Sequence, residues 1–126
     1  MRRILLDENV PEGLRQYLTD SCVSTAPEMG WAGLTNGQLL AAAERAGFDV
    51  MVTGDQNLTH QQNLTGRRLA IVALTTNHWA TLRANPQPIR DAVQAAEPGG
   101  YAVVAFPRPP LRRRPPHAPV VRRWPG

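Results

Sequence analysis

Acidic residues directly follow two apolar runs of the sequence, and these acids are the side chains best placed to do chemistry. Asp7 and Glu8 come after the run at residues 3–6, and Asp55 comes after the run at residues 49–53. Two carboxylates that share a site favour hard cations such as Mg²⁺ or Mn²⁺, which take oxygen ligands. An ion of this kind activates water and stabilises a scissile phosphate group. The pattern therefore indicates metal-assisted phosphodiester hydrolysis if the fold brings Asp7 and Asp55 together.

The same acids also have a purely structural explanation. Acidic residues just before a helix are favoured by the helix dipole and by capping, whatever the protein does. Asp7 and Glu8 precede Pro11, a residue typical of the first helical position. Asp55 precedes residues 58–65, which have a helical pattern. From spacing alone, both explanations stay open.

Composition excludes several other kinds of chemistry. All 14 basic side chains are Arg, so Lys-dependent phosphate loops and Schiff-base mechanisms are ruled out. The single Cys22 excludes Cys-based zinc and iron–sulfur sites and an intramolecular disulfide. The three histidines, His60, His78 and His117, are too scattered to form a His-x-x-x-His zinc pair. The groups that remain available for chemistry are carboxylates, amides, hydroxyls and Arg side chains.

Charge divides the chain into two parts. The net charge is +4, but residues 1–106 contain 8 Arg and 10 acids, whereas residues 107–126 contain 6 Arg and no acid. The last 20 residues also hold 7 of the 12 prolines, which oppose helices and sheet ladders and favour extended chain. We therefore expect one mildly acidic domain over residues 1–106 and a Pro/Arg-rich disordered tail over residues 107–126.

The sequence predicts no membrane segment. Its longest strongly apolar stretch, residues 69–74, is far shorter than the roughly 18 residues that a membrane-spanning helix needs. The basic and apolar start resembles a signal peptide only as far as Leu6, because Asp7 and Glu8 end the apolar region. We therefore expect a cytoplasmic protein.

Apolar runs alternate with segments of helical periodicity. Helices are expected after Pro11 and over residues 36–46, with Asn36 as the N-cap and Gly47 ending the helix. Pro86 and Pro88 are expected to break a further helical segment in two. The predicted strands are residues 3–6, 21–25, 49–53, 68–74 and 101–106, and the other predicted helices are residues 58–65 and 89–96.

This alternation predicts an α/β fold, a three-layer α/β/α sandwich with a mostly parallel sheet. In such sheets the ligand site lies outside the carboxyl ends of the strands, near a reversal of strand order. Neighbouring strands are about 4.8 Å apart. Asp7 and Asp55 are therefore expected to reach one crevice if the strands that precede them are neighbours.

Other side chains are weaker candidates for contacts with RNA. The basic tail is expected to stay solvated, and the alternatives are that it binds RNA in a salt-dependent way or folds back over the acidic crevice. Trp31 and Trp79 can stack on bases or anchor the core, and His78 is expected to be a cap or surface residue. The candidate RNA-binding residues are Arg67, Arg68, His60, Arg112, Arg113 and Arg114, each of which also fits a solvated surface position.

Several blocks of the chain resemble the PIN-like DUF5615 family. They occur in order over about residues 3–106 and read ILLDENVP (4–11), EMGWAG (28–33), NGQLLA (36–41), FDVMVTGDQNL (48–58) and QQNL (61–64). The resemblance implies a PIN-like α/β/α sandwich and an endoribonuclease centre that uses Mg²⁺ or Mn²⁺. It also implies a toxin of a toxin–antitoxin pair, with RNA, a cognate antitoxin protein and a second copy of the chain as expected partners.

The resemblance also assigns roles to particular residues. Asp7 and Asp55 match metal-binding acids, and Glu8 is an auxiliary catalytic acid. Gln38 stands where the family commonly has Glu, so it offers the metal a carbonyl oxygen without the negative charge. Glu44 lies about 600° further around the helix and is not expected to replace that charge. The alternative to a nuclease is a catalytically degenerate PIN-like domain that binds a protein or RNA without cleaving it.

Overall fold

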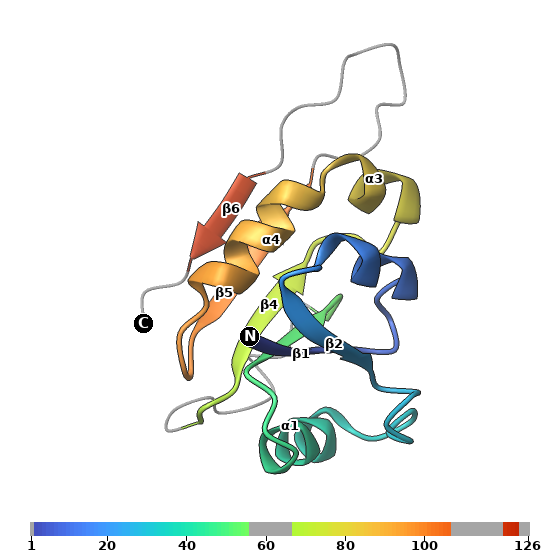
Figure 1. The fold of residues 1–126 in the computed structure, drawn as a ribbon, viewed down its shortest axis with the longest axis vertical. Coiled ribbons are helices and arrows are strands. Elements are labelled where there is room, and N and C mark those ends of the chain that lie inside the picture. Colours follow the sequence, from blue (N-terminus) through green and yellow to red (C-terminus); the bar gives the residue numbers. More distant parts are fainter. Residues whose placement is uncertain (1, 56–66, 107–119, 124–126) are drawn as a thin grey trace.

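The computed structural model describes residues 2–55, 67–106 and 120–123, the last four by their backbone alone. Short strands alternate with helices along the chain, as the sequence predicts (Figure 1). The strands are β1 (Arg2–Leu6), β2 (Ser21–Thr25), β3 (Val50–Thr53), β4 (Ala70–Leu74), β5 (Tyr101–Ala105) and β6 (Val120–Arg123). The helices are the 3₁₀ helix η1 (Glu12–Tyr17) and the α-helices α1 (Asn36–Arg45), α3 (Trp79–Ala84) and α4 (Pro86–Ala95).

The strands form one sheet in the order β2-β1-β3-β4-β5-β6. The first five strands are parallel, and β6 pairs antiparallel with β5 at the edge. The order reverses after β2, because the chain moves outward from β1 to β2 and then returns to the other side of β1 to form β3. This confirms the predicted mostly parallel α/β sheet.

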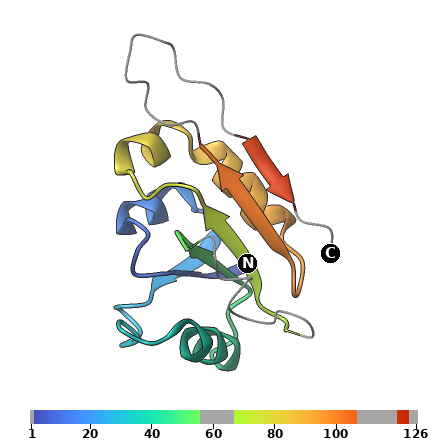
Figure 2. The same cartoon turned by 180° about the vertical axis from the view of Figure 1, so that it is seen from behind.

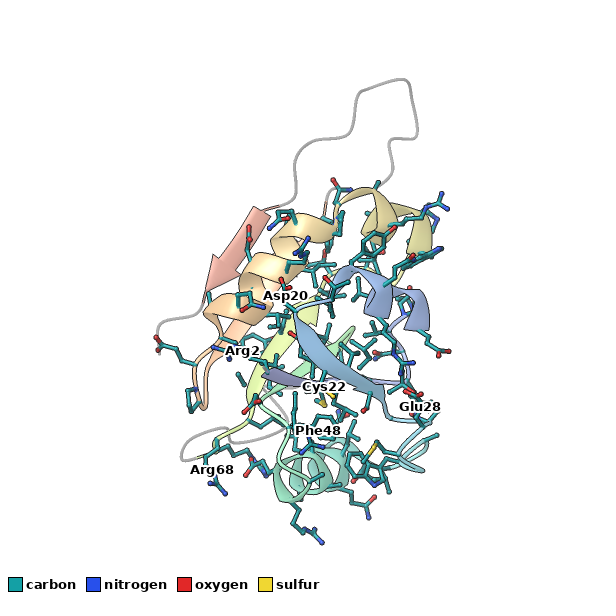
Figure 3. All side chains as sticks on the ribbon, in the orientation of Figure 1. Arg2, Asp20, Cys22, Glu28, Phe48 and Arg68 are labelled. Carbon is teal, nitrogen blue, oxygen red and sulfur yellow. The ribbon has the colours of Figure 1, made fainter. Side chains whose placement is uncertain are left out.

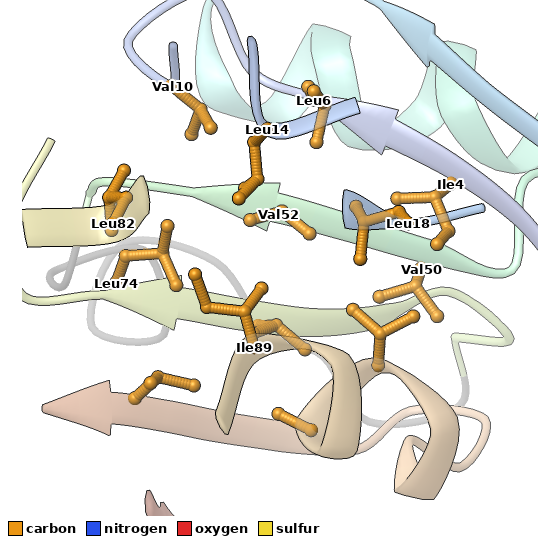
Figure 4. Packing of buried hydrophobic residues seen from close by; sticks show 14 of the residues in the cluster. Ile4, Leu6, Val10, Leu14, Leu18, Val50, Val52, Leu74, Leu82 and Ile89 are labelled. Carbon is orange, nitrogen blue, oxygen red and sulfur yellow. The ribbon is translucent and has the colours of Figure 1, made fainter. Parts of the chain in front are cut away.

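Helices cover both faces of the sheet, so the predicted three-layer sandwich is confirmed. Because side chains alternate along a strand, Ile4 and Leu6 point to one face and Leu5 points to the other. The first face packs against Leu14 of η1, Leu82 of α3 and residues of α4 (Figure 4). The second face packs against Leu39, Leu40 and Ala43 of α1, which lies on the opposite side of the sheet from α4 (Figures 1 and 2).

The helix expected after Pro11 is a 3₁₀ helix and not an α-helix. Its backbone hydrogen bonds span three residues, from the Leu14 N–H to the Pro11 carbonyl (3.1 Å) and from the Leu18 N–H to the Arg15 carbonyl (3.1 Å). At six residues it makes less than two turns of α-helix. A Cβ atom on Gly13 would lie 2.7 Å from the Trp79 indole, so this glycine lets η1 pack closely on α3.

Proline separates the two helices that precede β5, as predicted. Helix α3 ends at Ala84, and Asn85 leaves the helical region with φ −136° and ψ 58°. Helix α4 then begins at Pro86. Proline is tolerated there because the first helical N–H groups have no partner within the helix.

The expectation of a disordered tail does not hold for residues 120–123. These residues form β6, whose Val121 pairs with Val104 of β5. The segment Val120–Arg123 contains no proline and begins with two β-branched residues, which favour strands. The high proline content of the tail as a whole led to the expectation of disorder, although residues 120–123 themselves contain no proline. The remaining tail residues, 107–119 and 124–126, lie outside the described residues.

Thr35, and not Asn36, caps helix α1. The Thr35 hydroxyl accepts the Gln38 N–H at 3.3 Å, and the Gln38 side-chain oxygen accepts the Thr35 N–H at 3.0 Å. This reciprocal pair is a capping box, which satisfies two backbone donors at the helix start. Asn36 is instead the first helical residue.

We expect Thr35→Ala to lower the free energy of unfolding by about 1 kcal/mol, because it removes the N-cap acceptor. Urea denaturation followed by circular dichroism measures this change. Thr35→Ser keeps the hydroxyl and is expected to remain close to the wild type. Equal losses for the two variants would show that the hydroxyl is not the stabilising group.

Candidate functional site

Asp7 and Asp55 lie at the carboxyl ends of neighbouring strands. Strands β1 and β3 are parallel, with Leu6 paired to Val52, and the Asp7 N–H donates to the Val52 carbonyl at 2.9 Å. Asp55 follows two residues after the last residue of β3. The sheet order reverses between these two strands, which is where doubly wound sheets bind ligands. The predicted placement of the two acids at one edge is confirmed.

A buried hydroxyl connects the two acids. Thr53, the last residue of β3, is fully buried. Its hydroxyl donates to Asp7 Oδ2 at 2.8 Å, and its oxygen accepts the Asp55 N–H at 3.0 Å. One side chain therefore orients the carboxylate of Asp7 and fixes the backbone that carries Asp55. Thr53 was not among the predicted site residues, and its only signal in the sequence is its place two residues before Asp55.

The ionised form of the Asp7 side chain is disfavoured by its surroundings. Its side chain is buried, with 7% of its surface exposed. Burial raises the pKa of Asp7 and outweighs the hydrogen bonds from Thr53 and the Glu8 N–H, which lower it. The negative charges of Glu8 and Asp55 raise this pKa further. Since a nearby cation favours the ionised form of a carboxylate, a bound cation would relieve both effects.

Two amide side chains complete the surroundings of Asp55. Asn36 Nδ2 donates to Asp55 Oδ2 at 3.0 Å, which ties the start of α1 to the loop after β3. Asn9 Oδ1 accepts the Gly54 N–H at 2.9 Å, which ties the loops after β1 and β3 together. Neither asparagine was recognised as a site residue in the sequence, although Asn9 follows Asp7 and Glu8 directly. The amides hold Asp55 and its loop in place beside Asp7.

Glu8 lies at the exposed rim of this arrangement. Its backbone N–H donates to Asp7 Oδ1 at 2.8 Å, and its own carboxylate accepts the Gly33 N–H at 3.4 Å. Gly33 belongs to the loop between β2 and α1 and has a φ of +86°, a conformation that favours glycine. The Glu8 carboxylate therefore sits next to Asp7 while remaining open to solvent.

Gln38 occupies a different environment from the expected metal-ligand position. Its side-chain oxygen accepts the Thr35 N–H within the capping box of α1, so this oxygen is turned towards the backbone of its own helix. Across residues 2–55 and 67–106, no three His, Cys, Asp or Glu side chains gather as ligands of one ion. Among the described side chains, the available hard-oxygen donors are therefore a carboxylate pair with amide and hydroxyl neighbours.

We expect Gln38→Glu to change Mn²⁺ affinity less than about threefold, because a Glu at this position completes the same capping box. Isothermal titration of Mn²⁺ into both proteins measures the difference. A large gain in affinity would contradict the geometry, since it would place the new carboxylate at the metal and not at the helix start.

Arg67 and Arg68 lie near the amino ends of the parallel strands, whereas the acids lie at the carboxyl ends. They precede β4, whose first residue Ala70 pairs with Val50 at the start of β3. Strands rise about 3.3 Å per residue, so the length of the strand separates these arginines from the carboxyl ends. Figure 3 shows Arg68 on the far side of the molecule from Glu28, which follows the carboxyl end of β2. Their place ahead of a strand agrees with the solvated surface position that was the alternative for them, and contact with RNA stays a prediction.

Arg67 has an ion pair of its own at that edge. Its Nη1 lies 2.9 Å from Oε1 of Glu44 on α1. Glu44 therefore does not join Asp7 and Asp55, as expected from its position on the helix. The other candidate RNA-binding residues, His60, Arg112, Arg113 and Arg114, lie outside the described residues.

Both tryptophans of the described region are anchors of the core. Trp31 packs edge-on against Phe48, with ring centroids 6.0 Å apart. Trp79 packs against Tyr17, with centroids 6.2 Å apart. Both indoles are half-buried and contact the hydrophobic clusters. Of the two roles considered for them, the packing role is the one that the structure shows.

No family model, curated protein or solved structure matches this chain. Among the described helices, none has both the length and the apolar character to span a membrane.

Proposed function

We propose that the chain is a metal-dependent endoribonuclease of the PIN-like type. The observation that carries this proposal is the pairing of Asp7 and Asp55 at the strand-order reversal, linked through the Thr53 hydroxyl. The buried position of Asp7 adds support, because a divalent cation would offset its unfavourable charge. The resemblance of the sequence blocks around both acids to the PIN-like DUF5615 family points to the same chemistry.

The oxygens present fit a hard divalent cation. Asp7 and Asp55 would hold Mg²⁺ or Mn²⁺, with water filling the remaining positions. When bound, such an ion supplies charge stabilisation at the phosphate and a more acidic water. Asp7 is kept in one orientation by the Thr53 hydroxyl and the Glu8 N–H. Glu8, exposed beside Asp7, is the group available to take the proton from the attacking water.

Cleavage of single-stranded RNA tests the proposal. We expect the wild type to cut labelled RNA with Mn²⁺ or Mg²⁺ and to stop when EDTA removes the ion. Asp55→Asn is expected to lose this activity, and Asp91→Asn, an exposed acid on α4, is expected to keep it. A folded wild type that leaves RNA intact with both ions would count against the nuclease.

The small number of acids at the site favours a second candidate function. Across residues 2–55 and 67–106, no third His, Cys, Asp or Glu side chain gathers with Asp7 and Asp55 as a ligand of one ion. In this alternative, the chain is a degenerate PIN-like domain that binds RNA or protein without cleavage. Absence of Mn²⁺ binding in the folded wild type, together with retained RNA binding, would favour it.

We also propose that the chain is the toxin of a toxin–antitoxin pair. This role rests on the resemblance alone, as do the antitoxin partner and the second copy of the chain. Growth arrest on expression, relieved by Asp7→Asn, supports a toxin. Normal growth with abundant folded protein contradicts it.

A further inference from the structure

The side chain of Asn9 joins the two loops that carry the acids. Asn9 follows Asp7 by two residues, in a turn that the Val10 N–H closes by donating to the Asp7 carbonyl at 3.0 Å. Its side-chain oxygen accepts the Gly54 N–H at 2.9 Å, and Gly54 directly precedes Asp55. Asn9 therefore belongs to the turn after β1 and contacts the loop after β3, at the edge of the sheet where both acids lie.

This contact fixes the orientation of the Asn9 amide. Because the Gly54 N–H is a donor, the amide oxygen faces Gly54 and the amide nitrogen Nδ2 is turned away from it. A Cβ atom on Gly54 would lie 3.4 Å from both Cγ and Oδ1 of Asn9, so the amide packs directly on this glycine. Asn9 is exposed, and among the described residues none accepts a hydrogen bond from Nδ2. The site therefore holds an oriented donor at its rim.

The other side-chain donors described at the site are bonded to the acids. The Thr53 hydroxyl donates to the Asp7 carboxylate at 2.8 Å. The Asn36 amide donates to the Asp55 carboxylate at 3.0 Å. Asn9 differs from both, because its side chain holds the backbone of the neighbouring loop through its oxygen and keeps its N–H groups for another acceptor.

A phosphate group at this site meets a surplus of negative charge from Asp7, Glu8 and Asp55. A bound divalent cation offsets part of this charge. Attack of water on the phosphorus then places further negative charge on the non-bridging oxygens, where an oriented hydrogen-bond donor stabilises it. A neutral amide can do this without competing with the cation for the carboxylates.

We propose that Asn9 is a further catalytic residue, whose Nδ2 donates a hydrogen bond to a non-bridging oxygen of the scissile phosphate. This inference rests on the proposed nuclease function, which supplies the phosphate. The Gly54 N–H holds the amide in place, so the donor is oriented before the substrate binds. Asn9 then acts on the phosphate, while Asp7 and Asp55 act on the cation.

Cleavage rates at saturating Mn²⁺ and RNA test this role, because changes in affinity do not contribute to them. Asn9→Ala removes the donor and the contact with Gly54, and we expect a rate about 10- to 100-fold below that of the wild type. Asn9→Asp keeps an oxygen for the Gly54 N–H but has no amide donor, so it is expected to be no faster than Asn9→Ala. Gln94→Glu makes the same amide-to-carboxylate change at an exposed position of α4 and is expected to keep the wild-type rate. Circular dichroism checks that each variant is folded.

RNA with sulfur in place of one non-bridging oxygen separates a phosphate contact from a structural role. Sulfur is a weak hydrogen-bond acceptor, so the substitution weakens the contact with Nδ2. Any effect of sulfur on the cation is common to the wild type and Asn9→Ala, so a difference between the two proteins reports the contact. We expect sulfur in one of the two diastereomeric positions to slow the wild type about fivefold more than Asn9→Ala.

Two results would overturn the inference while leaving the nuclease in place. A higher rate in Asn9→Asp than in Asn9→Ala would show that the side chain serves as an anchor for Gly54. An equal effect of sulfur on the wild type and Asn9→Ala in both positions would show that Asn9 does not touch the phosphate. A folded wild type that leaves RNA intact overturns the inference together with the proposed function, so the wild type itself tells the two failures apart.

Discussion

Asp7→Asn is expected to lower the rate of Mn²⁺-dependent RNA cleavage at least about 100-fold, because it removes a ligand charge from the metal. The substitution keeps the shape of the side chain and its place after β1. It leaves Asp55 as the remaining carboxylate of the pair. Cleavage rates at saturating RNA, measured over a range of Mn²⁺ concentrations, give the change. Rescue at high Mn²⁺ would assign the defect to metal affinity.

The same substitution is expected to stabilise the metal-free protein at neutral pH. Burial raises the pKa of Asp7 in the folded state, so the folded chain binds more protons than the unfolded chain around that pKa. Stability therefore falls as the pH rises through this range and is fully restored below the unfolded pKa. Asn carries no charge, so Asp7→Asn melts at a higher temperature than the wild type at neutral pH. The difference disappears below the ordinary Asp pKa of about 3.9.

Thermal melts in EDTA across this pH range measure the effect, with Asp91→Asn as the control. Asp91 is exposed on α4, so its substitution leaves the profile unchanged. A lower melting temperature for Asp7→Asn at neutral pH would show that its carboxylate stabilises the empty site. Loss of cleavage together with a gain in stability is the signature of a group retained for function.

Thr53→Val has the second large effect, because it removes the hydroxyl between the acids while keeping the volume. Asp7 Oδ2 then loses its donor and the Asp55 N–H loses its acceptor, both next to a fully buried side chain. A buried polar group left without a partner costs about 1–3 kcal/mol of stability. Loss of an orienting partner lowers metal affinity by about 10- to 100-fold.

Thr53→Ser separates the hydroxyl from the methyl group. It keeps both hydrogen bonds and loses one buried methyl, at a cost of about 1 kcal/mol. We expect its Mn²⁺ affinity to stay within about threefold of the wild type, because the orienting hydroxyl remains. Urea denaturation and Mn²⁺ titration of both variants measure the two quantities. Equal metal affinities for Thr53→Val and Thr53→Ser would remove Thr53 from the account of the site.

The parts of the fold that place the acids could be predicted from sequence. Runs such as residues 3–6 and 49–53 are short, apolar and followed by acids, which identifies buried parallel strands and their carboxyl ends. The order of the strands does not follow from the sequence, because the adjacency of β1 and β3 depends on packing between segments far apart in the chain. The structure supplies this adjacency and with it the pairing of Asp7 and Asp55.

The roles of individual side chains around the acids could not be predicted in the same way. Gln38 completes the capping box and Asn36 contacts Asp55, because the helix begins one residue earlier than expected, at Asn36, with Thr35 as its N-cap. Strand β6 depends on pairing with β5, which local composition does not encode. The sequence predicts Thr53 only as a residue of a buried strand. Its role becomes apparent from the structure, where its hydroxyl bonds both Asp7 and the Asp55 N–H.

The position of Arg67 and Arg68 could be predicted from the sequence. Both residues precede β4, so the polarity of a parallel sheet places them at the strand ends opposite the acids. Their charge makes them candidates for binding RNA, and that role stays a prediction.

Calorimetric titration of Mn²⁺ into the wild type, Asp7→Asn and Asp55→Asn tests most directly whether Asp7 and Asp55 bind one cation together. We predict one bound ion per wild-type chain and a loss of that binding in each variant, with circular dichroism showing that all three proteins are folded. Binding that survives in either variant, or a folded wild type that takes up no ion, would contradict a cation held jointly by Asp7 and Asp55.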